Sequence, residues 1–147
     1  MGVQGKLTAS TGVKCGGHLI YDIFHFNPHH VPNISPSKVK SFEIHQGGTI
    51  KTGSIVSWNY YIDGKEKIDK QVIEAIDPKK KSITWKMIEG GVLEFYNSFT
   101  AIISCENQRI TWTFVYEKKT TAIPDPLGLL DFLIELTHDI EGHFLKK

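Results

Sequence analysis

The chain has 147 residues and a formal net charge of +1, from 17 basic and 16 acidic side chains. A chain of this length forms one domain, which we place over residues 1–147, and buries about 68–70% of its unfolded surface. The balanced charge produces no strong field towards nucleic acid or a membrane. Arg109 is the only arginine, whereas arginine is the commonest side chain in base recognition. We therefore expect no nucleic-acid partner and no membrane partner.

The two cysteines, Cys15 and Cys105, lie far apart in the sequence and form neither a zinc ligand set nor a disulfide framework. No apolar run reaches the ~18 residues of a membrane span, and the N-terminal residues lack the apolar segment of a signal peptide. We expect a cytoplasmic protein that is a monomer or a weak dimer.

The first third of the chain predicts a strand, two short helices and a second strand. Apolar and polar side chains alternate over residues 7–13, as in a strand with one buried face. Residues 18–26 have apolar side chains at helical spacing, and Pro28 ends that helix. The prolines that follow limit a second helix to a short one. Residues 39–46 then read as a strand that leads into a glycine-bearing loop.

Five further strands are predicted in the middle of the chain. Asp63 and Gly64 form the strongest short hairpin signal that a sequence offers. Because the other connections are also short turns, we expect the seven strands to form an antiparallel sheet. The five strands cover residues 54–62, 65–76, 82–88, 92–105 and 110–119.

A single amphipathic helix is predicted for residues 129–147, after a linker over residues 120–128 that contains two prolines. Leu133, Thr137 and Ile140 fall within one broad apolar stripe of this helix. About 20 residues at 1.5 Å each make a rod of ~30 Å, long enough to lie across a curled sheet. We predict an α+β fold in which the sheet wraps around this helix and the two short helices close one end.

The apolar face of the sheet allows two interpretations. Ile83, Trp85 and Met87 fall on one face of their strand, and Phe95 falls on the matching face of the next. These side chains either pack directly against the C-terminal helix, as in ordinary close-packed interiors, or line a hollow. Thr137, in the middle of the apolar stripe, and the small amount of helix available both favour a hollow lined mainly by apolar groups.

Several segments carry a family resemblance in the same order and spacing: PHHVPNISP, GSIVSWNYYIDGK, QVIEAID, KSITWKMIEGG and LLDFLIELTHDIEGHFLK. The chain is similar over nearly its whole length to the plant major latex proteins, which belong to the birch-pollen-allergen superfamily of class-ten pathogenesis-related proteins. The resemblance implies a helix-grip fold. It also implies an internal cavity for steroid-like, hormone-like or aromatic-metabolite-like molecules, with a role in plant defence or stress.

The glycine-bearing loop departs from the family pattern. Thr49 and Ile50 stand where the family usually has tryptophan and glycine. A β-branched residue does not readily adopt positive φ, so we expect this loop to differ in shape. Its glycines, Gly47, Gly48 and Gly53, are expected to flank the mouth of the cavity.

The predicted ligand-contacting residues are the apolar side chains that face the hollow, together with one hydroxyl. Binding is expected to come from apolar area removed from water, at about 25 cal/mol per Å², and Thr137 is the expected hydrogen-bonding member. The full set is Phe24, Ile83, Trp85, Met87, Phe95, Leu133, Thr137 and Ile140.

No motif for a cofactor, a metal or a nucleophile stands out. The glycine-bearing loop lacks the lysine-serine ending of a P-loop. Pro28 interrupts the helix between His25 and His29, so these histidines do not form the spaced pair that grips zinc. We expect no catalytic residue, no cofactor and no metal.

Three functions remain open at this point. The leading hypothesis is a carrier or sensor of a small hydrophobic molecule, and the second is an isomerase or cyclase of plant specialised metabolism in the same cavity, as in some members of the superfamily. The third is an interaction protein with a filled core. If the cavity performs chemistry, the candidate polar groups are Tyr60 or Tyr61, Thr137, and Tyr96 or Tyr116.

Overall fold

The computed structural model describes residues 2–46 and 48–146. Seven strands form one antiparallel sheet in the order β1-β7-β6-β5-β4-β3-β2, so β1 and β2 are its edges. The predicted seven-stranded antiparallel sheet is confirmed. The strands are β1 (Val3–Gly12), β2 (Val39–Gln46), β3 (Ile55–Ile62), β4 (Lys65–Asp77), β5 (Ser82–Gly90), β6 (Tyr96–Glu106) and β7 (Arg109–Lys118).

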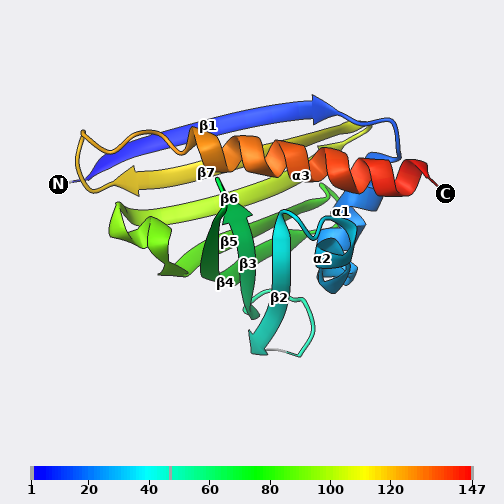
Figure 1. The fold of residues 1–147 in the computed structure, drawn as a ribbon, viewed down its shortest axis with the longest axis horizontal. Coiled ribbons are helices and arrows are strands. Elements are labelled where there is room, and N and C mark those ends of the chain that lie inside the picture. Colours follow the sequence, from blue (N-terminus) through cyan, green and yellow to red (C-terminus); the bar gives the residue numbers. More distant parts are fainter. Residues whose placement is uncertain (1, 47, 147) are drawn as a thin grey trace.

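The described residues contain three α-helices, of which one is long and two are short. The long helix α3 (Leu127–Leu145) contacts β1, β3 and β7, and it also contacts α1 and α2. Figure 1 shows α3 lying along the sheet, with α1 and α2 at the end of the molecule where α3 finishes. These short helices join one edge strand of the sheet to the other and close that end, as predicted. They are α1 (Gly17–Phe26), the 3-10 turn η1 (Pro28–His30) and α2 (Val31–Ile34).

The hairpin turns follow the residue types that the sequence supplies. Asp63 and Gly64 both adopt positive φ, at 52° and 75°, as a two-residue hairpin turn with right-handed strand twist requires. The next two tight turns end at Lys81 and contain Asn107, with φ of 51° and 56°. The predicted hairpin at Asp63 and Gly64 is therefore confirmed.

The prediction for the start of the sixth strand was wrong. A second 3-10 turn, η2 (Gly91–Glu94), intervenes, and β6 begins at Tyr96. Gly90 has φ of 142°, a conformation that only glycine adopts easily, and this turns the chain out of β5. Three residues per turn break the two-residue alternation of a strand. As a result Phe95 is 51% exposed, and the side chain of Tyr96 is buried instead.

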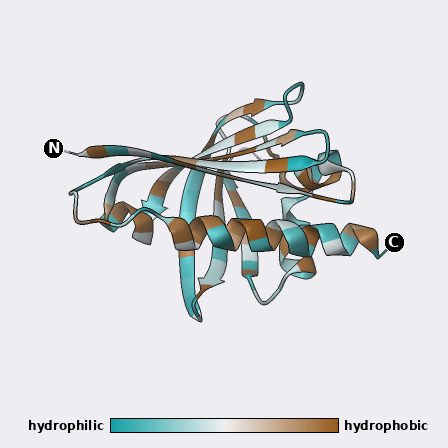
Figure 2. Cartoon of the chain, turned by 90° about the horizontal axis from the view of Figure 1, so that it is seen from above, coloured by the Kyte–Doolittle hydropathy of each residue, from teal (hydrophilic) through white to brown (hydrophobic). Residues whose placement is uncertain are grey.

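The core lies between the inner face of the sheet and α3. In β5 the buried side chains are Ile83, Trp85 and Met87, in strict alternation. The apolar stripe of α3 presents Leu136 and Ile140 to the interior, and Figure 2 shows apolar residues recurring along the whole helix. No helix within the described residues is both long and apolar enough to cross a membrane.

Candidate ligand-binding cavity

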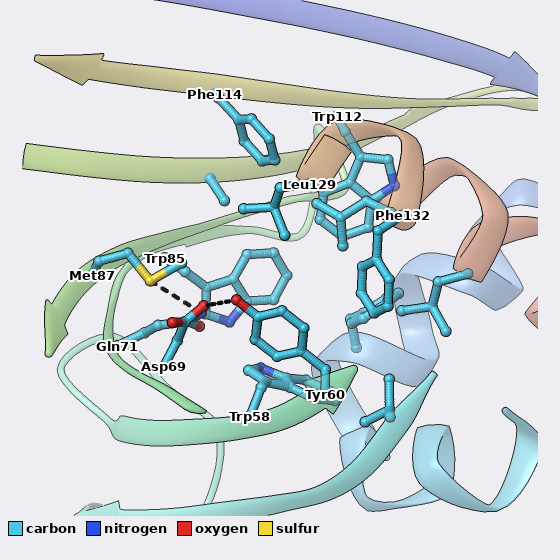
Figure 3. A pocket seen from close by; sticks show the side chains of 15 residues that line it. Trp58, Tyr60, Asp69, Gln71, Trp85, Met87, Trp112, Phe114, Leu129 and Phe132 are labelled. Atoms are coloured by element: carbon cyan, nitrogen blue, oxygen red, sulfur yellow. Dashed lines mark hydrogen bonds between the residues drawn. The ribbon is translucent and has the colours of Figure 1, made fainter. Parts of the chain in front are cut away.

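A cavity of about 70 Å³, measured as the space open to the centre of a water molecule, lies between α3 and the middle of the sheet. Its lining comes from α1, from α3 and from every strand except β1. The chain has three tryptophans, Trp58, Trp85 and Trp112, and all of them line this cavity. Figure 3 shows how these rings surround the space. Intrinsic fluorescence of this protein therefore reports on the cavity.

The aromatic wall is held together by Phe24 of α1. Its ring centroid lies 6.0 Å from Trp58, 6.0 Å from Trp85 and 5.5 Å from Trp112. Trp85 and Trp112 stack on each other, with centroids 6.0 Å apart and planes 20° from parallel. Each such ring pair contributes about 0.5–1.5 kcal/mol beyond its buried area. The end helix thus fixes three rings that reach it from β3, β5 and β7.

The size of the cavity sets the size of a guest. Pockets for drug-sized ligands measure about 300–1,000 Å³, while one water needs about 10–15 Å³ of such space. A cavity of about 70 Å³ therefore accepts a few waters or one small ring without rearrangement. The aromatic rings fill most of the trough that the sheet forms, and the space that remains is small.

Three lining side chains are only partly buried, namely Trp58 of β3 and Leu129 and Leu133 of α3. The other lining residues are buried. The wall formed by β3 and the first turns of α3 is therefore the part of the cavity lining that is closest to solvent. A guest that enters or enlarges the cavity meets the least resistance here, because these three side chains are the least buried of the lining.

The structure brings four of the predicted contact residues together around the cavity and places the others elsewhere. Phe24, Trp85, Met87 and Leu133 line it. Ile83 and Ile140 are fully buried in the surrounding core, outside the lining. Phe95 lies away from the cavity at the end of η2, with its side chain half exposed.

The hydroxyl of Thr137 already has two hydrogen-bond partners within the protein. It accepts a hydrogen bond from Nε1 of Trp112 at 2.9 Å and donates one to the carbonyl oxygen of Leu133 at 2.7 Å. Thr137 is fully buried and is not part of the lining. A threonine in the apolar stripe is thus explained by the indole N–H, which needs an acceptor when it is buried.

The glycine-bearing loop is fixed by a buried serine. Ser54 Oγ donates to the carbonyl oxygen of Thr49 at 2.7 Å and accepts from the backbone N–H of Lys51 at 3.1 Å. Positive φ falls on Gly48 and Gly53, at 68° and 95°. The β-branched residues of the loop therefore avoid that conformation. Neither of these two glycines lines the cavity, and the predicted mouth residue at position 47 lies outside the described residues.

One end of the cavity is polar. The hydroxyl of Tyr60 donates to Oδ2 of Asp69 at 2.5 Å, and Nε2 of Gln71 donates to the sulfur of Met87 at 3.5 Å. Asp69 and Gln71 lie two residues apart on β4 and point into the cavity together, as Figure 3 shows. Asp69 is 2% exposed and Gln71 is 7% exposed. We call Tyr60, Asp69 and Gln71 the polar end.

A glycine on the neighbouring strand makes room for the carboxylate. Gly90 pairs with Asp69 across β4 and β5, and a Cβ added to it would lie 2.6 Å from Oδ1 of Asp69. A β-bulge at Ile88 shifts the register immediately beside this pair. The Asp69 side chain therefore occupies space that any other residue at position 90 would take.

Burial dominates the electrostatics of the polar end. Loss of hydration raises the pKa of Asp69 to about 6, although the hydrogen bond from Tyr60 and the charge of Lys67 act to lower it. The same burial, together with the charge of Asp69 and its hydrogen bond, holds the pKa of Tyr60 well above its ordinary value. At neutral pH the carboxyl is mostly ionised and the phenol is protonated.

The sequence does not single out Asp69 and Gln71 because β4 carries two competing patterns. Ile68 and Val72 mark one face of the strand as apolar, yet the inward face is that of Asp69, Gln71 and Ile73. Ile68 is 57% exposed. On the inward parity the strand offers only Ile73 and the small Ala75 as apolar residues, and Ala75 is exposed.

The tyrosines predicted as candidate polar groups form different hydrogen bonds in the structure. Tyr60 belongs to the polar end. Tyr96 and Tyr116 use their hydroxyls on the linker before α3, donating to the carbonyl oxygen of Pro124 at 2.7 Å and to the carboxylate of Asp125 at 2.8 Å. Within the described residues there is no group of three or more metal-ligating side chains.

Comparisons with known proteins agree with this fold. Residues 2–147 match the model of the pathogenesis-related protein Bet v 1 family. MLP-like protein 31 from Arabidopsis thaliana is 36% identical, with 97% of this chain and 87% of that protein covered. The crystal structure of ginseng major latex-like protein 151 from Panax ginseng superposes with a TM-score of 0.93 at 42% identity, covering 97% of this chain and 98% of that one.

A more distant structure shares the fold alone. Norcoclaurine synthase from Thalictrum flavum, in complex with dopamine and hydroxybenzaldehyde, has a TM-score of 0.74 at 19% identity, with 99% of this chain and 88% of that chain covered.

Proposed function

The chain belongs to the pathogenesis-related protein Bet v 1 family, and we propose that it is a carrier or sensor that binds a small hydrophobic molecule between α3 and the sheet. The observation that carries the proposal is an interior space lined by three tryptophans and by the aliphatic side chains of α3, with one polar end. The proposal includes a role in plant defence or stress, which the pathogenesis-related description of the family supports, and a cytoplasmic location.

The size of the cavity limits the binding free energy that a ligand can gain from buried apolar area. One aromatic ring buries about 150–250 Å², which is worth roughly 4–6 kcal/mol at about 25 cal/mol per Å². That corresponds to a dissociation constant of about 0.05–1 mM for a one-ring ligand. Tighter binding of a larger molecule requires the cavity to grow. Met87, Leu129 and Leu133 are the lining side chains that can yield, because Met87 is unbranched and the leucines are partly exposed.

Titration with toluene tests the proposal, with tryptophan fluorescence and calorimetry as readouts. Leu133→Trp fills the space beside α3 and should abolish toluene binding. Leu127→Trp is the matched control, because Leu127 is on the same helix but 59% exposed, and it should leave binding unchanged. Equal binding by both variants, or no binding by the unmodified protein, would overturn the proposal.

A second candidate function is catalysis in the same cavity. The specific observation in its favour is the pair formed by Tyr60 and Asp69, because the carboxyl pKa of about 6 lies close to the working pH that suits a general base. A carrier returns its ligand unchanged, whereas an enzyme releases an altered product. Mass spectrometry of candidate aromatic substrates after incubation separates the two, with Asp69→Asn as the variant that should stop turnover.

A further inference from the structure

We propose that the polar end of the cavity selects one-ring ligands that donate a hydrogen bond, namely amines and alcohols, and rejects carboxylic acids. The inference rests on the proposed function, because it assigns the class of molecule that the same cavity accepts. Three observations support it: an unpaired acceptor on Gln71, a surplus of acceptors around it, and the absence of a cationic lining residue.

The first observation is an acceptor without a partner. Oε1 of Gln71 is buried and forms no hydrogen bond with any described residue. The orientation of the amide follows from its other contact, because a thioether sulfur can only accept and the Nε2 group faces the sulfur of Met87. The carbonyl oxygen is therefore the free end. Leaving such a group unpaired is unfavourable, and a ligand N–H or O–H would recover that cost.

The second observation is that the neighbouring groups are acceptors as well. The only proton of the Tyr60 hydroxyl is given to Asp69. An ionised carboxylate accepts hydrogen bonds and donates none. The polar end consequently offers lone pairs on three side chains, against one remaining donor, the second N–H of Gln71 Nε2. A ligand hydroxyl or ammonium group matches this excess of acceptors, whereas a ligand carboxylate would find one N–H and otherwise meet lone pairs.

The third observation concerns charge. Asp69 is the one ionisable side chain with a formal charge among the residues that line the cavity, and none of those residues is a lysine, arginine or histidine. A buried charge is costly unless it is paired. An ammonium group beside Asp69 would pair it, whereas a second carboxylate would add like-charge repulsion worth several kcal/mol. The small volume restricts the body of the ligand to about one ring.

Four probes that share one ring provide the test: toluene, benzyl alcohol, benzylamine and benzoate. Binding to the unmodified protein is measured by calorimetry at pH 7. Benzylamine should bind at least about 100-fold more tightly than benzoate, because like charges are opposed in the second case. Leu133→Trp should abolish binding of both toluene and benzylamine. Binding of benzylamine that survives Leu133→Trp, or a preference for benzoate, would overturn the inference.

Two variants resolve the polar end. Asp69→Asn should reduce the preference for benzylamine over benzoate to less than about tenfold. Gln71→Met replaces the amide with an apolar chain of similar length. It should lower the affinity for benzyl alcohol, relative to the affinity for toluene, by about 2–12-fold. Glu74→Gln, at an exposed carboxylate on the same strand, is the matched control and should change nothing.

The outcomes separate this inference from the proposed function. If none of the four probes binds, the cavity is not a binding site and both fall. If toluene binds but the four probes show no preference, or Asp69→Asn and Gln71→Met leave the preferences intact, the polar end does not select and only this inference falls. The comparison of probes on the unmodified protein decides the matter even where a variant fails to fold.

Discussion

Replacing Asp69 with asparagine should remove a destabilising contribution to the free energy of unfolding that grows with pH. The ordinary carboxyl pKa of 3.8 is raised to about 6 by burial. Below pH 3.8 the carboxyl is protonated in both the folded and unfolded states, and above about pH 6 it is ionised in both. Between these values the folded state binds more protons, so stability falls as pH rises. At 1.36 kcal/mol per pKa unit the full cost is ~3 kcal/mol, of which about 2.5 kcal/mol develops between pH 4 and pH 7.

Urea denaturation of both proteins at pH 4, 5, 6 and 7 measures this cost. The advantage of Asp69→Asn over the unmodified protein should grow by about 2.5 kcal/mol across the series, because asparagine still accepts the hydrogen bond from Tyr60 but carries no charge. Glu74→Gln should show no comparable trend, because Glu74 is exposed. A difference that stays constant with pH, or that reverses, would show that the carboxylate has a compensating partner and would refute the reasoning.

Two further substitutions test the packing around the cavity. Thr137→Val leaves the N–H of Trp112 without its acceptor and should lower the free energy of unfolding by about 1–3 kcal/mol, measured by urea denaturation; no loss would mean that the indole is hydrated. Gly90→Ala forces φ of 142° on alanine and places its Cβ 2.6 Å from Oδ1 of Asp69. The free energy of unfolding should therefore fall by about 1–3 kcal/mol or more in the same assay. Gly91→Ala, which meets nothing within 4 Å, should be nearly neutral, and equal effects of the two glycine variants would contradict the structure.

Much of the fold could be predicted because local patterns and global structure agree. The alternation of Ile83, Trp85 and Met87 survives in β5, where all three are buried. Asp63 and Gly64 form the turn that their residue types favour. The amphipathic stripe of the last helix places its apolar side against the sheet. In each case a short stretch contains all the information that decides its structure.

The site was less accessible to sequence because its decisive contacts are long-range. Thr137 was read as a ligand contact, but its hydroxyl meets the indole of Trp112, which lies 25 residues away in the sequence. The sequence predicts Phe95 within a strand that begins at residue 92, but the 3-10 turn after Gly90 delays that strand to Tyr96 and leaves Phe95 at the surface. Contacts between residues far apart in the sequence depend on how the sheet curls, and the spacing of apolar residues within one strand or helix does not reveal this.

The polar end shows the same difficulty in another form. On β4 the apolar side chains Ile68 and Val72 mark the face that turns away from the cavity, and the polar Asp69 and Gln71 occupy the inward face. Binary patterning assumes that inward residues are apolar. A break of this rule is expected where a functional site lies, and the proposed ligand-selecting role would account for the polar residues on this face.

A crystal structure of the protein soaked with iodobenzene tests most directly whether the interior accepts an apolar guest. The anomalous signal of iodine should lie within the cavity, between the rings of Trp58, Trp85 and Trp112, with the side chains of Leu129 and Leu133 displaced to admit it. An interior without iodine at saturating concentrations, with the three indoles and Phe24 in unbroken contact, would contradict the proposed binding function.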